Sequence, residues 1–364
     1  MANKKESKTE YLRYPNGPAS NQMMNVVSHS DQLEEFQKRL GATSHSSVIE
    51  IYVPKDGTES NRQVIYKTDN TETTIQLANI DLFSKSKKPL KKILTYTLVK
   101  LSQINIMEGQ SNDITISFPL QDFVDLGSYK NITTARQAFN QAMNPLTSIK
   151  LSGLVKDRKE QHKITDSEIE VLFTGAKIKK GIVEIYLNKR INWQLFALQY
   201  FSILPKTYFS LSDNAADSLL NISILARKRI SEIKKNGFFT LSFRSLQQIL
   251  SLPSEDKTKN PGRDIKDAIL NALAEINENN PDEMNIESVY NPNGNIIQFL
   301  NEGYAKITLR NEFENYFTAL AEKKAEKIES SIKRHDEIMT KAKIKAMAGK
   351  LESELATEKT QEDE

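Results

Sequence analysis

The chain has 364 residues, of which 38% are apolar and 27% charged, with a net charge of +3 and no cysteine. The lack of cysteine excludes disulfides, thiolate metal sites and cysteine nucleophiles, and it fits a cytoplasmic protein. No apolar run reaches the roughly 18 residues of a membrane span, and the first residues lack the apolar core of a signal peptide. The length suits two domains, and the polar composition predicts some solvated helix or disorder.

The charge is unevenly distributed. Residues 85–190 hold 18 lysines and arginines against 10 acidic residues, a net of +8, whereas residues 312–364 hold 10 against 13, a net of −3. A basic middle and an acidic end suit a body that binds a polyanion and a separate tail. Lysine-rich surfaces are also common in ordinary proteins, so charge alone favours nucleic acid only modestly.

The N-terminal third predicts a disordered segment and then a small sheet. Residues 1–44 are expected to be mostly disordered, apart from a short helix at 31–40. Alternating apolar residues at 48–53 and 62–66 flank a turn and predict a hairpin, and residues 73–80 a third strand. A helix is then expected to start at Pro89, because Leu90, Ile93, Leu94, Leu98 and Leu101 recur at helical spacing.

The stretch from Ile114 to Leu187 has the pattern on which the functional interpretation depends. A strand at 114–118 is followed by a short helix at 119–126, closed by Gly127, and by a second helix from about Thr133. Three strands are then expected, at 150–155, 168–173 and 182–187. Strand, two helices and hairpin is the order of a winged helix-turn-helix, whose second helix enters the DNA major groove.

The second helix of this stretch has two distinct faces. One stripe is apolar, and its members recur at offsets of 0, 4, 7, 8 and 11: Ala135, Phe139, Ala142, Met143 and Leu146. The opposite face is polar and lacks acids: Arg136, Gln137, Asn140, Gln141 and Asn144. Thr133 is expected to cap the helix, and Pro145 to kink or end it near Asn144.

The same pattern recurs later in the chain. A helix at 214–235, a strand at 239–243 and a short helix at 245–252 lead to a helix at 264–276 with the same offsets. Its stripe consists of Ile265, Ile269, Ala272, Leu273 and Ile276. Strands are expected at 285–290, 296–300 and 304–309, with a turn at 291–294. The chain therefore contains a divergent duplication with a period of roughly 125–130 residues.

The fold class expected is α+β, with two tandem winged helix-turn-helix domains, an N-terminal β-rich extension and a long polar C-terminal helix. The domains are a disordered segment (1–44), a first unit (45–190), a second unit (191–311) and a C-terminal helix with an acidic tail (312–364). The aromatic stretch 191–210 is expected to be a packed connector, the alternative being an exposed patch for a partner. The C-terminal helix is either solvated or an interaction or dimerisation tail.

Signatures of catalysis are missing. The four histidines stand in no metal-binding spacing, and the glycines form no P-loop or dinucleotide-binding motif. We therefore expect no enzyme, no cofactor and no metal site.

The candidate DNA contacts divide into base readers and phosphate binders. On the second helix of the first unit, asparagine and glutamine pair with adenine and arginine with guanine: Thr133, Arg136, Gln137, Asn140 and Gln141. Phosphate contacts are assigned to basic residues near the expected wing: Lys156, Arg158, Lys159, Lys163, Lys177, Lys179 and Lys180. The second unit offers Lys257, Lys259, Arg263, Lys266 and Asn271, with contacts expected to be less well defined because Asp267 and Glu275 dilute the charge.

The two-unit layout resembles the iteron-binding plasmid replication initiator (Rep) proteins with two winged-helix domains. The resemblance covers roughly residues 89–310 and is most specific in Phe238–Leu252, the helix from Asp264 to Asn277 and the strand that ends at Arg310. It implies binding to repeated origin sites, duplex opening and recruitment of the host initiator and replicative helicase. It also implies homodimers that repress their own promoter and monomers that initiate.

Two other functions use the same sequence features. A winged-helix transcriptional regulator or partition factor would bind a promoter operator, and its deletion would leave replication intact. A nucleic-acid-processing enzyme would need scattered carboxylates, to which no pattern in the sequence points.

Overall fold

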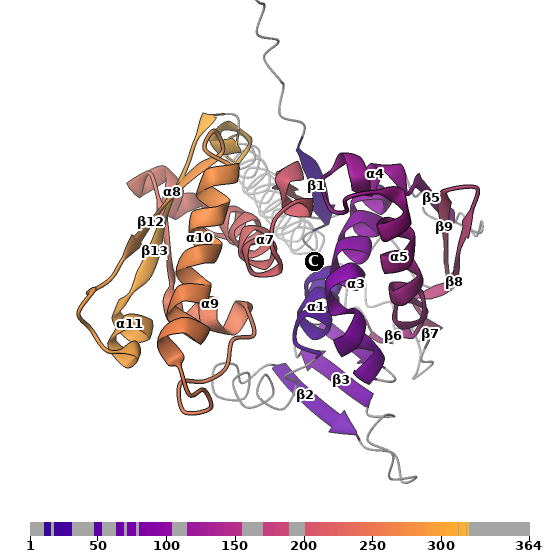
Figure 1. Ribbon diagram of the computed structural model, residues 1–364, viewed down its shortest axis with the longest axis horizontal. Coiled ribbons are helices and arrows are strands. Elements are labelled where there is room, and N and C mark those ends of the chain that lie inside the picture. Colours follow the sequence, from indigo (N-terminus) through magenta and orange to yellow (C-terminus); the bar gives the residue numbers. More distant parts are fainter. Residues whose placement is uncertain are drawn as a thin grey trace, which may run out of the picture.

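The computed structural model describes residues 11–15, 18–30, 47–52, 63–68, 71–77, 80–103, 115–154, 170–188, 201–311, 313–317 and 319. Helices are interspersed with small antiparallel sheets along this part of the chain, as expected of an α+β fold. The two units lie side by side, the first in purple on the right of Figure 1 and the second in orange on the left. No helix among these residues is long and apolar enough to span a bilayer.

The first unit combines three helices with a three-stranded sheet. Its elements are α3 (Ile80–Gln103), β5 (Thr115–Pro119), α4 (Gln121–Asp125), α5 (Ile132–Thr147), β8 (Phe173–Lys179) and β9 (Ile182–Leu187). In the sheet, β9 lies between β5 and β8 and is antiparallel to both. The last strand of the unit therefore holds the other two together.

The second unit repeats this order with three further helical elements. Its elements are α7 (Asp213–Lys228), α8 (Ile230–Asn236), β11 (Phe239–Ser242), α9 (Phe243–Ile249), the π-helical turn η3 (Gly262–Asp267), α10 (Ala268–Asn279), β12 (Met284–Val289), α11 (Ile296–Glu302) and β13 (Tyr304–Leu309). Again the last strand, β13, lies between the first and the middle strand. The two units thus share element order and strand order.

A separate five-stranded sheet packs below the first unit in Figure 1. Its strands are β2 (Ser47–Tyr52), β3 (Gln63–Thr68), β4 (Thr71–Leu77), β6 (Ile149–Leu154) and β7 (Glu170–Val171). The predicted hairpin and third strand are confirmed, because β3 pairs antiparallel with both β2 and β4. The strand expected at 150–155 is present as β6, but it pairs with β4 and not with the hairpin β8–β9.

The strand expected at 168–173 is divided between two sheets. It breaks at Leu172, which separates β7 from β8, and the side chain of Leu172 is buried. The backbone N–H of Leu172 donates to the carbonyl of Ile149 at 2.8 Å, which ties the break to β6. The hairpin of the first unit is therefore β8–β9, with its turn at Lys180 and Gly181. The lysines and arginine at 156–163 lie outside the described residues.

Both predicted apolar stripes are confirmed. In α5 the side chains of Ala135, Phe139, Ala142 and Leu146 are buried, and Met143 is half-buried. In η3 and α10 all five predicted members are buried: Ile265, Ile269, Ala272, Leu273 and Ile276. The offsets 0, 4, 7, 8 and 11 place each set along one side of a helix, and that side packs on the core of its unit.

Two predicted boundaries and one predicted element type are wrong. Helix α3 begins at Ile80 rather than at Pro89, which lies within it, because buried Phe83 and Ser86 extend its packed side. The helix expected at 214–235 breaks at Arg229 into α7 and α8. The strand expected at 296–300 is the helix α11, because Asn295 and Gln298 form a reciprocal capping box at its start.

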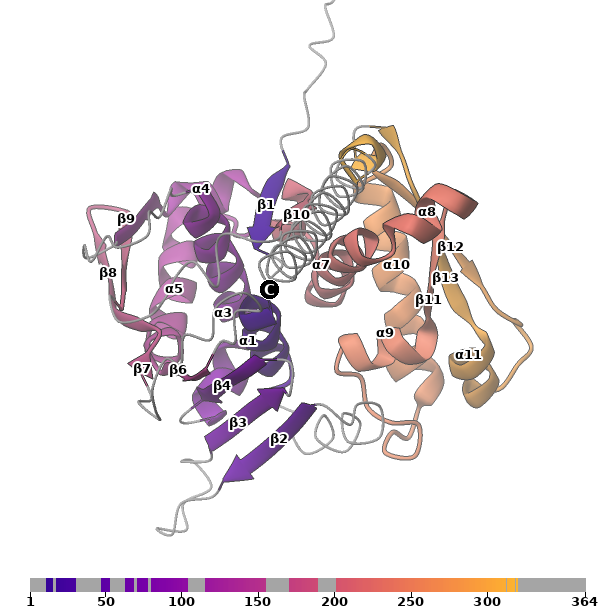
Figure 2. The same ribbon diagram turned by 180° about the vertical axis from the view of Figure 1, so that it is seen from behind.

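The N-terminal segment is ordered over two stretches that were expected to be disordered. Residues Leu12–Pro15 form β1, which pairs antiparallel with β10 (Phe201–Leu204) in the connector between the units (Figures 1 and 2). Helix α1 (Pro18–Ser28) follows and packs on α3. This segment was missed because few of its residues are apolar, yet Tyr14, Met23 and Val27 are buried. The helix expected at 31–40 lies outside the described residues.

The connector and the start of the C-terminal helix pack where the units meet. Tyr208 and Phe209 are buried, and the ring of Phe209 meets Tyr96 at 5.5 Å between centroids. The predicted packed connector is thus confirmed for its last residues, while 191–200 lie outside the described part. Phe313 and Phe317 are also buried, and Phe313 lies 5.5 Å from Tyr11.

Candidate nucleic-acid interface

Helix α5 presents its polar side to solvent. The buried side packs on α3, α4 and β8, which leaves the opposite side uncovered. Its N-cap is Asn131, whose side-chain oxygen accepts from the N–H of Thr134 at 2.9 Å. The expectation that Thr133 caps the helix is therefore wrong: Thr133 lies within the first turn and is exposed. Asn131 stands two residues earlier, and asparagine is preferred to threonine at the N-cap position.

The predicted base-reading side chains share one exposed surface with Asn144, which we call the α5 face: Thr133, Arg136, Gln137, Asn140, Gln141 and Asn144. No hydrogen bond or ion pair engages their side chains within the described part of the chain. The face also lacks carboxylates. Unpaired amide and guanidinium groups on an exposed helix are available for an external partner, and an acid-free face suits a polyanion.

Of the two predicted outcomes, a kink or an end near Asn144, the end is wrong, because helix α5 continues through Pro145 to Thr147. Proline cannot donate to the carbonyl of Gln141, four residues earlier. The hydroxyl of Ser86, on α3, donates to that carbonyl at 3.0 Å instead. The neighbouring helix therefore satisfies the acceptor that proline leaves open, and the α5 face keeps its last turn.

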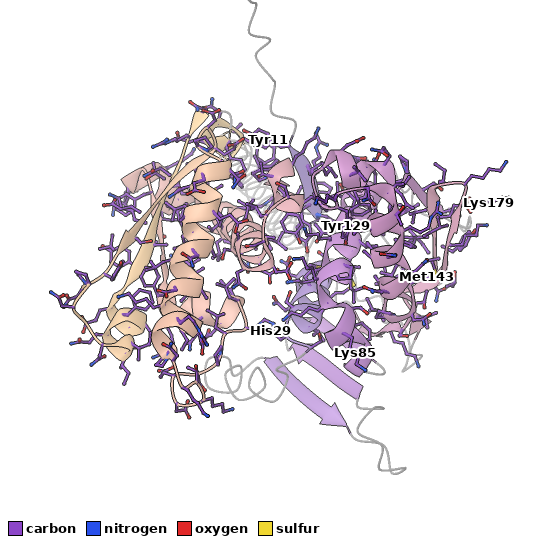
Figure 3. The ribbon with its side chains drawn as sticks, viewed as in Figure 1. Tyr11, His29, Lys85, Tyr129, Met143 and Lys179 are labelled. Carbon is purple, nitrogen blue, oxygen red and sulfur yellow. The ribbon has the colours of Figure 1, made fainter. Side chains whose placement is uncertain are left out.

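The hairpin β8–β9 projects beside α5, and Lys179 points away from the body at its outer end (Figure 3). Lys180 and Gly181 form the turn with φ of 50° and 80°, a left-handed pair that matches strand twist. Lys179 and Lys180 are exposed, as phosphate-binding residues need to be.

Lys177 is held within the hairpin. Its ammonium lies 2.9 Å from the carboxylate of Glu184 and over the ring of Tyr186. Hydrogen bonding to Tyr186 and Glu184 raises the pKa of Lys177, and hydrogen bonds from Lys177 and from the Tyr186 hydroxyl lower the pKa of Glu184. Lys177 therefore contributes less free positive charge than its neighbour Lys179.

In the second unit, some of the predicted DNA-binding side chains already interact with other residues of the same unit, unlike those of the α5 face. Arg263 lies 2.9 Å from Asp264, whose pKa is lowered by the hydroxyl of Thr258 and by Arg263. The ammonium of Lys266 lies 5.1 Å from the centroid of the Tyr290 ring and near that of Phe299. Lys257, Lys259 and Asn271 are exposed. The arginine and Lys266 already have partners, so this surface is less free than the α5 face.

The carboxylate of Glu275 accepts from two neutral groups, the backbone N–H of Ser212 at 2.7 Å and the Ser212 hydroxyl. The basic surface expected from the charge count needs correction. Lys91 and Lys92, counted in the basic stretch 85–190, are buried. Lys91 pairs with Asp217 at 2.6 Å, and Lys92 donates to the carbonyl of Phe209 at 2.7 Å. The basic surface is therefore smaller than the sequence count.

Sequence reasoning missed one residue of the interface. Ile132, in the first turn of α5, is 40% exposed. It stands three residues before Ala135, so helical spacing places it on the apolar side of α5, and the sequence pattern gave no indication of its exposure. Among the described residues no three histidine or acidic side chains gather as metal ligands would.

No protein-family model matches the chain, and no curated protein matches it in sequence. Among solved structures, a crystal structure of RctB domains 2–3 (RctB-155-483) matches with 10% identity and a TM-score of 0.37. The match covers 75% of this chain and 94% of that chain. At this identity and TM-score the likeness supports no inference about function.

Proposed function

We propose that the chain is a sequence-specific DNA-binding replication initiator, built on two winged helix-turn-helix units. The observation that carries the DNA-binding part is the α5 face, with its free amides, one arginine and no acid, beside a hairpin that ends in two exposed lysines. In this proposal α5 enters the major groove of double-stranded DNA, and Lys179 and Lys180 contact phosphates.

The second unit makes auxiliary contacts to the same duplex in this proposal. Helices α5 and α10 both lie toward the viewer in Figure 1, each in its own unit. The Arg263–Asp264 pair and the position of Lys266 over aromatic rings reduce the free charge that this unit offers. Specificity is therefore assigned mainly to the first unit.

The initiator role follows the resemblance to plasmid Rep proteins. It entails binding to repeated origin sites, local duplex opening, and recruitment of a host initiator and helicase, without catalysis by this chain. Footprinting on the DNA that flanks the gene tests the binding step, and protection of direct repeats of about 20 base pairs is expected, a length that fits two helices one turn apart. A plasmid that carries only this gene and its flanking DNA tests replication.

The outcomes separate the competing functions. Protection of an inverted promoter site without plasmid replication favours a regulator or partition factor. Metal-dependent nicking of supercoiled DNA by the purified protein would replace the proposal with an enzyme. Absence of any protected repeat contradicts the initiator role.

Asn140→Ala tests the α5 face. Loss of a bidentate contact with adenine is expected to cost about 1–3 kcal/mol at one base position, with little effect on random DNA. Lys179→Ala is expected to weaken specific and random DNA alike, because phosphates are the same in every sequence. Affinity for both DNAs is measured by fluorescence anisotropy at fixed salt, with Asn236→Ala, exposed at the end of α8, as the matched control. Equal loss on both DNAs for Asn140→Ala would show that the face is misassigned.

A further inference from the structure

The first turn of α5 exposes methyl groups rather than charge. Ile132 is one of three large apolar side chains exposed among the described residues, the others being Ile182 and Ile297. Thr133 and Thr134 beside it are also exposed. The hydroxyl of Thr134 donates to the side chain of Asn131 at 3.2 Å, so its methyl group is the part left for a partner.

The next turns of the α5 face are dominated by amides. Gln137, Asn140, Gln141 and Asn144 are exposed, and Arg136 is the one cation of the face. Asparagine and glutamine are suited to the N6 donor and N7 acceptor of adenine. An acidic side chain, which would accept from cytosine, is absent from this face, and only Arg136 is suited to guanine.

Methyl groups and amides are suited to the two members of the same base pair, thymine and adenine. The thymine methyl is the apolar group on the major-groove edge, and it is contacted by aliphatic side chains and threonine methyls. One isoleucine among threonines and amides offers far less apolar area than a protein partner needs, which is on the order of 1,000 Å² in total. The surroundings of Ile132 therefore favour a small apolar target within a polar ligand.

We infer that the half-site read by α5 is rich in A·T base pairs, with Ile132 and the threonine methyls against thymine methyls and the amides against adenine. This inference rests on the proposed DNA-binding function. It adds a base composition, and it makes Ile132 a specificity-determining residue.

The first experiment selects duplexes from a randomised pool with the full chain and then alters the selected site atom by atom. Replacing thymine by uracil removes only the methyl group, and binding is expected to weaken about fourfold for each methyl that is lost from contact. Replacing adenine by 7-deazaadenine removes the N7 acceptor, and binding is expected to weaken about tenfold or more at a contacted position.

Two variants assign each effect to its side chain. Ile132→Ser is expected to lose the discrimination between thymine and uracil at the position that Ile132 contacts, while keeping the discrimination at positions contacted by threonine methyls and the sensitivity to 7-deazaadenine. Asn140→Ala is expected to lose the sensitivity to 7-deazaadenine at one adenine and to keep the discrimination between thymine and uracil. Ile297→Ser, which replaces an isoleucine 52% exposed on α11, is the matched control and keeps both sensitivities. Because Ile132 is exposed, thermal unfolding of its variant is expected to match that of the wild type.

The results distinguish a failure of the inferred A·T preference from a failure of the proposed DNA-binding function. Selected sites rich in G·C, or equal binding of thymine and uracil duplexes by the wild type, overturn the inference and leave sequence-specific binding in place. A loss of uracil sensitivity in Ile297→Ser also overturns the assignment to Ile132. Failure to enrich any duplex removes the proposed function itself.

Discussion

At the scale of single residues, a buried lysine near the junction of the units makes stability depend on pH. Burial, together with the charges of Lys88 and Lys91, lowers the pKa of Lys92 from 10.5 to about 8, against the opposing effect of Asp213. The unfolded chain therefore binds more protons than the folded chain between about pH 8 and 10.5. Stability from this group rises with pH across that window.

Lys92→Met is expected to remove this rise. Between pH 7.5 and 9.5 the free energy of unfolding of the wild type is expected to gain on the order of 1–2 kcal/mol relative to the variant. Urea titrations at the two pH values measure the difference. The window stops below pH 10, because burial raises the pKa of Tyr208 and ionisation of tyrosines in the unfolded chain would then oppose the trend. Parallel pH profiles for the two proteins would contradict the assignment to Lys92.

At the scale of elements, α5 depends on its neighbour at one carbonyl. The hydroxyl of Ser86 donates to the carbonyl of Gln141, which Pro145 leaves without its helical donor. Ser86→Ala is expected to cost about 1–2 kcal/mol in the wild type, since the carbonyl is then unpaired. In the Pro145→Ala background the same change is expected to cost under about 0.5 kcal/mol, because alanine restores the N–H. Equal costs in both backgrounds, measured by thermal unfolding, would show that the hydroxyl does not replace the missing donor.

Elements with a strong apolar period were predictable, and elements set by distant pairing were not. The offsets of Ala135, Phe139 and Leu146 identified both the helix and its exposed side. Strand β6 was found but assigned to the wrong sheet, because a strand's own alternation does not encode its partner. Helix α11 was predicted to be a strand, because a short apolar run is compatible with either a helix or a strand. The capping box at Asn295, which favours a helix, did not enter that prediction. The partners of Lys91 and Lys92 lie more than a hundred residues away and leave no local pattern.

At the scale of the whole molecule, the two units are joined by polar contacts as well as by apolar ones. The buried pair Lys91–Asp217 links α3 to α7. His29, after α1, lies with Nε2 2.9 Å from the carbonyl of Gln248 on α9. A buried charge between the units that loses its counter-ion lowers the free energy of unfolding, because the remaining charge is then buried without compensation.

Asp217→Asn is expected to destabilise the chain by about 3–5 kcal/mol, because it leaves the buried ammonium of Lys91 without a counter-ion. One turn away, the pair Lys88–Asp213 spans 3.7 Å between the same helices, with side chains 58% and 37% exposed. Asp213→Asn is the matched control and is expected to cost below about 1 kcal/mol. Chemical denaturation of both variants measures the contrast, and similar losses would mean that burial does not govern the strength of the pair.

The pairing of β1 with β10 has a consequence for how the protein is made. Leu12 leaves the ribosome well before its partner Leu204, which emerges only after the whole first unit has been translated. Strand β1 cannot form its hydrogen bonds until β10 has been synthesised, and pairing between segments far apart in the sequence is slow. A nascent chain stalled before Phe201 therefore carries an unpaired strand edge, the kind of surface that chaperones shield from aggregation.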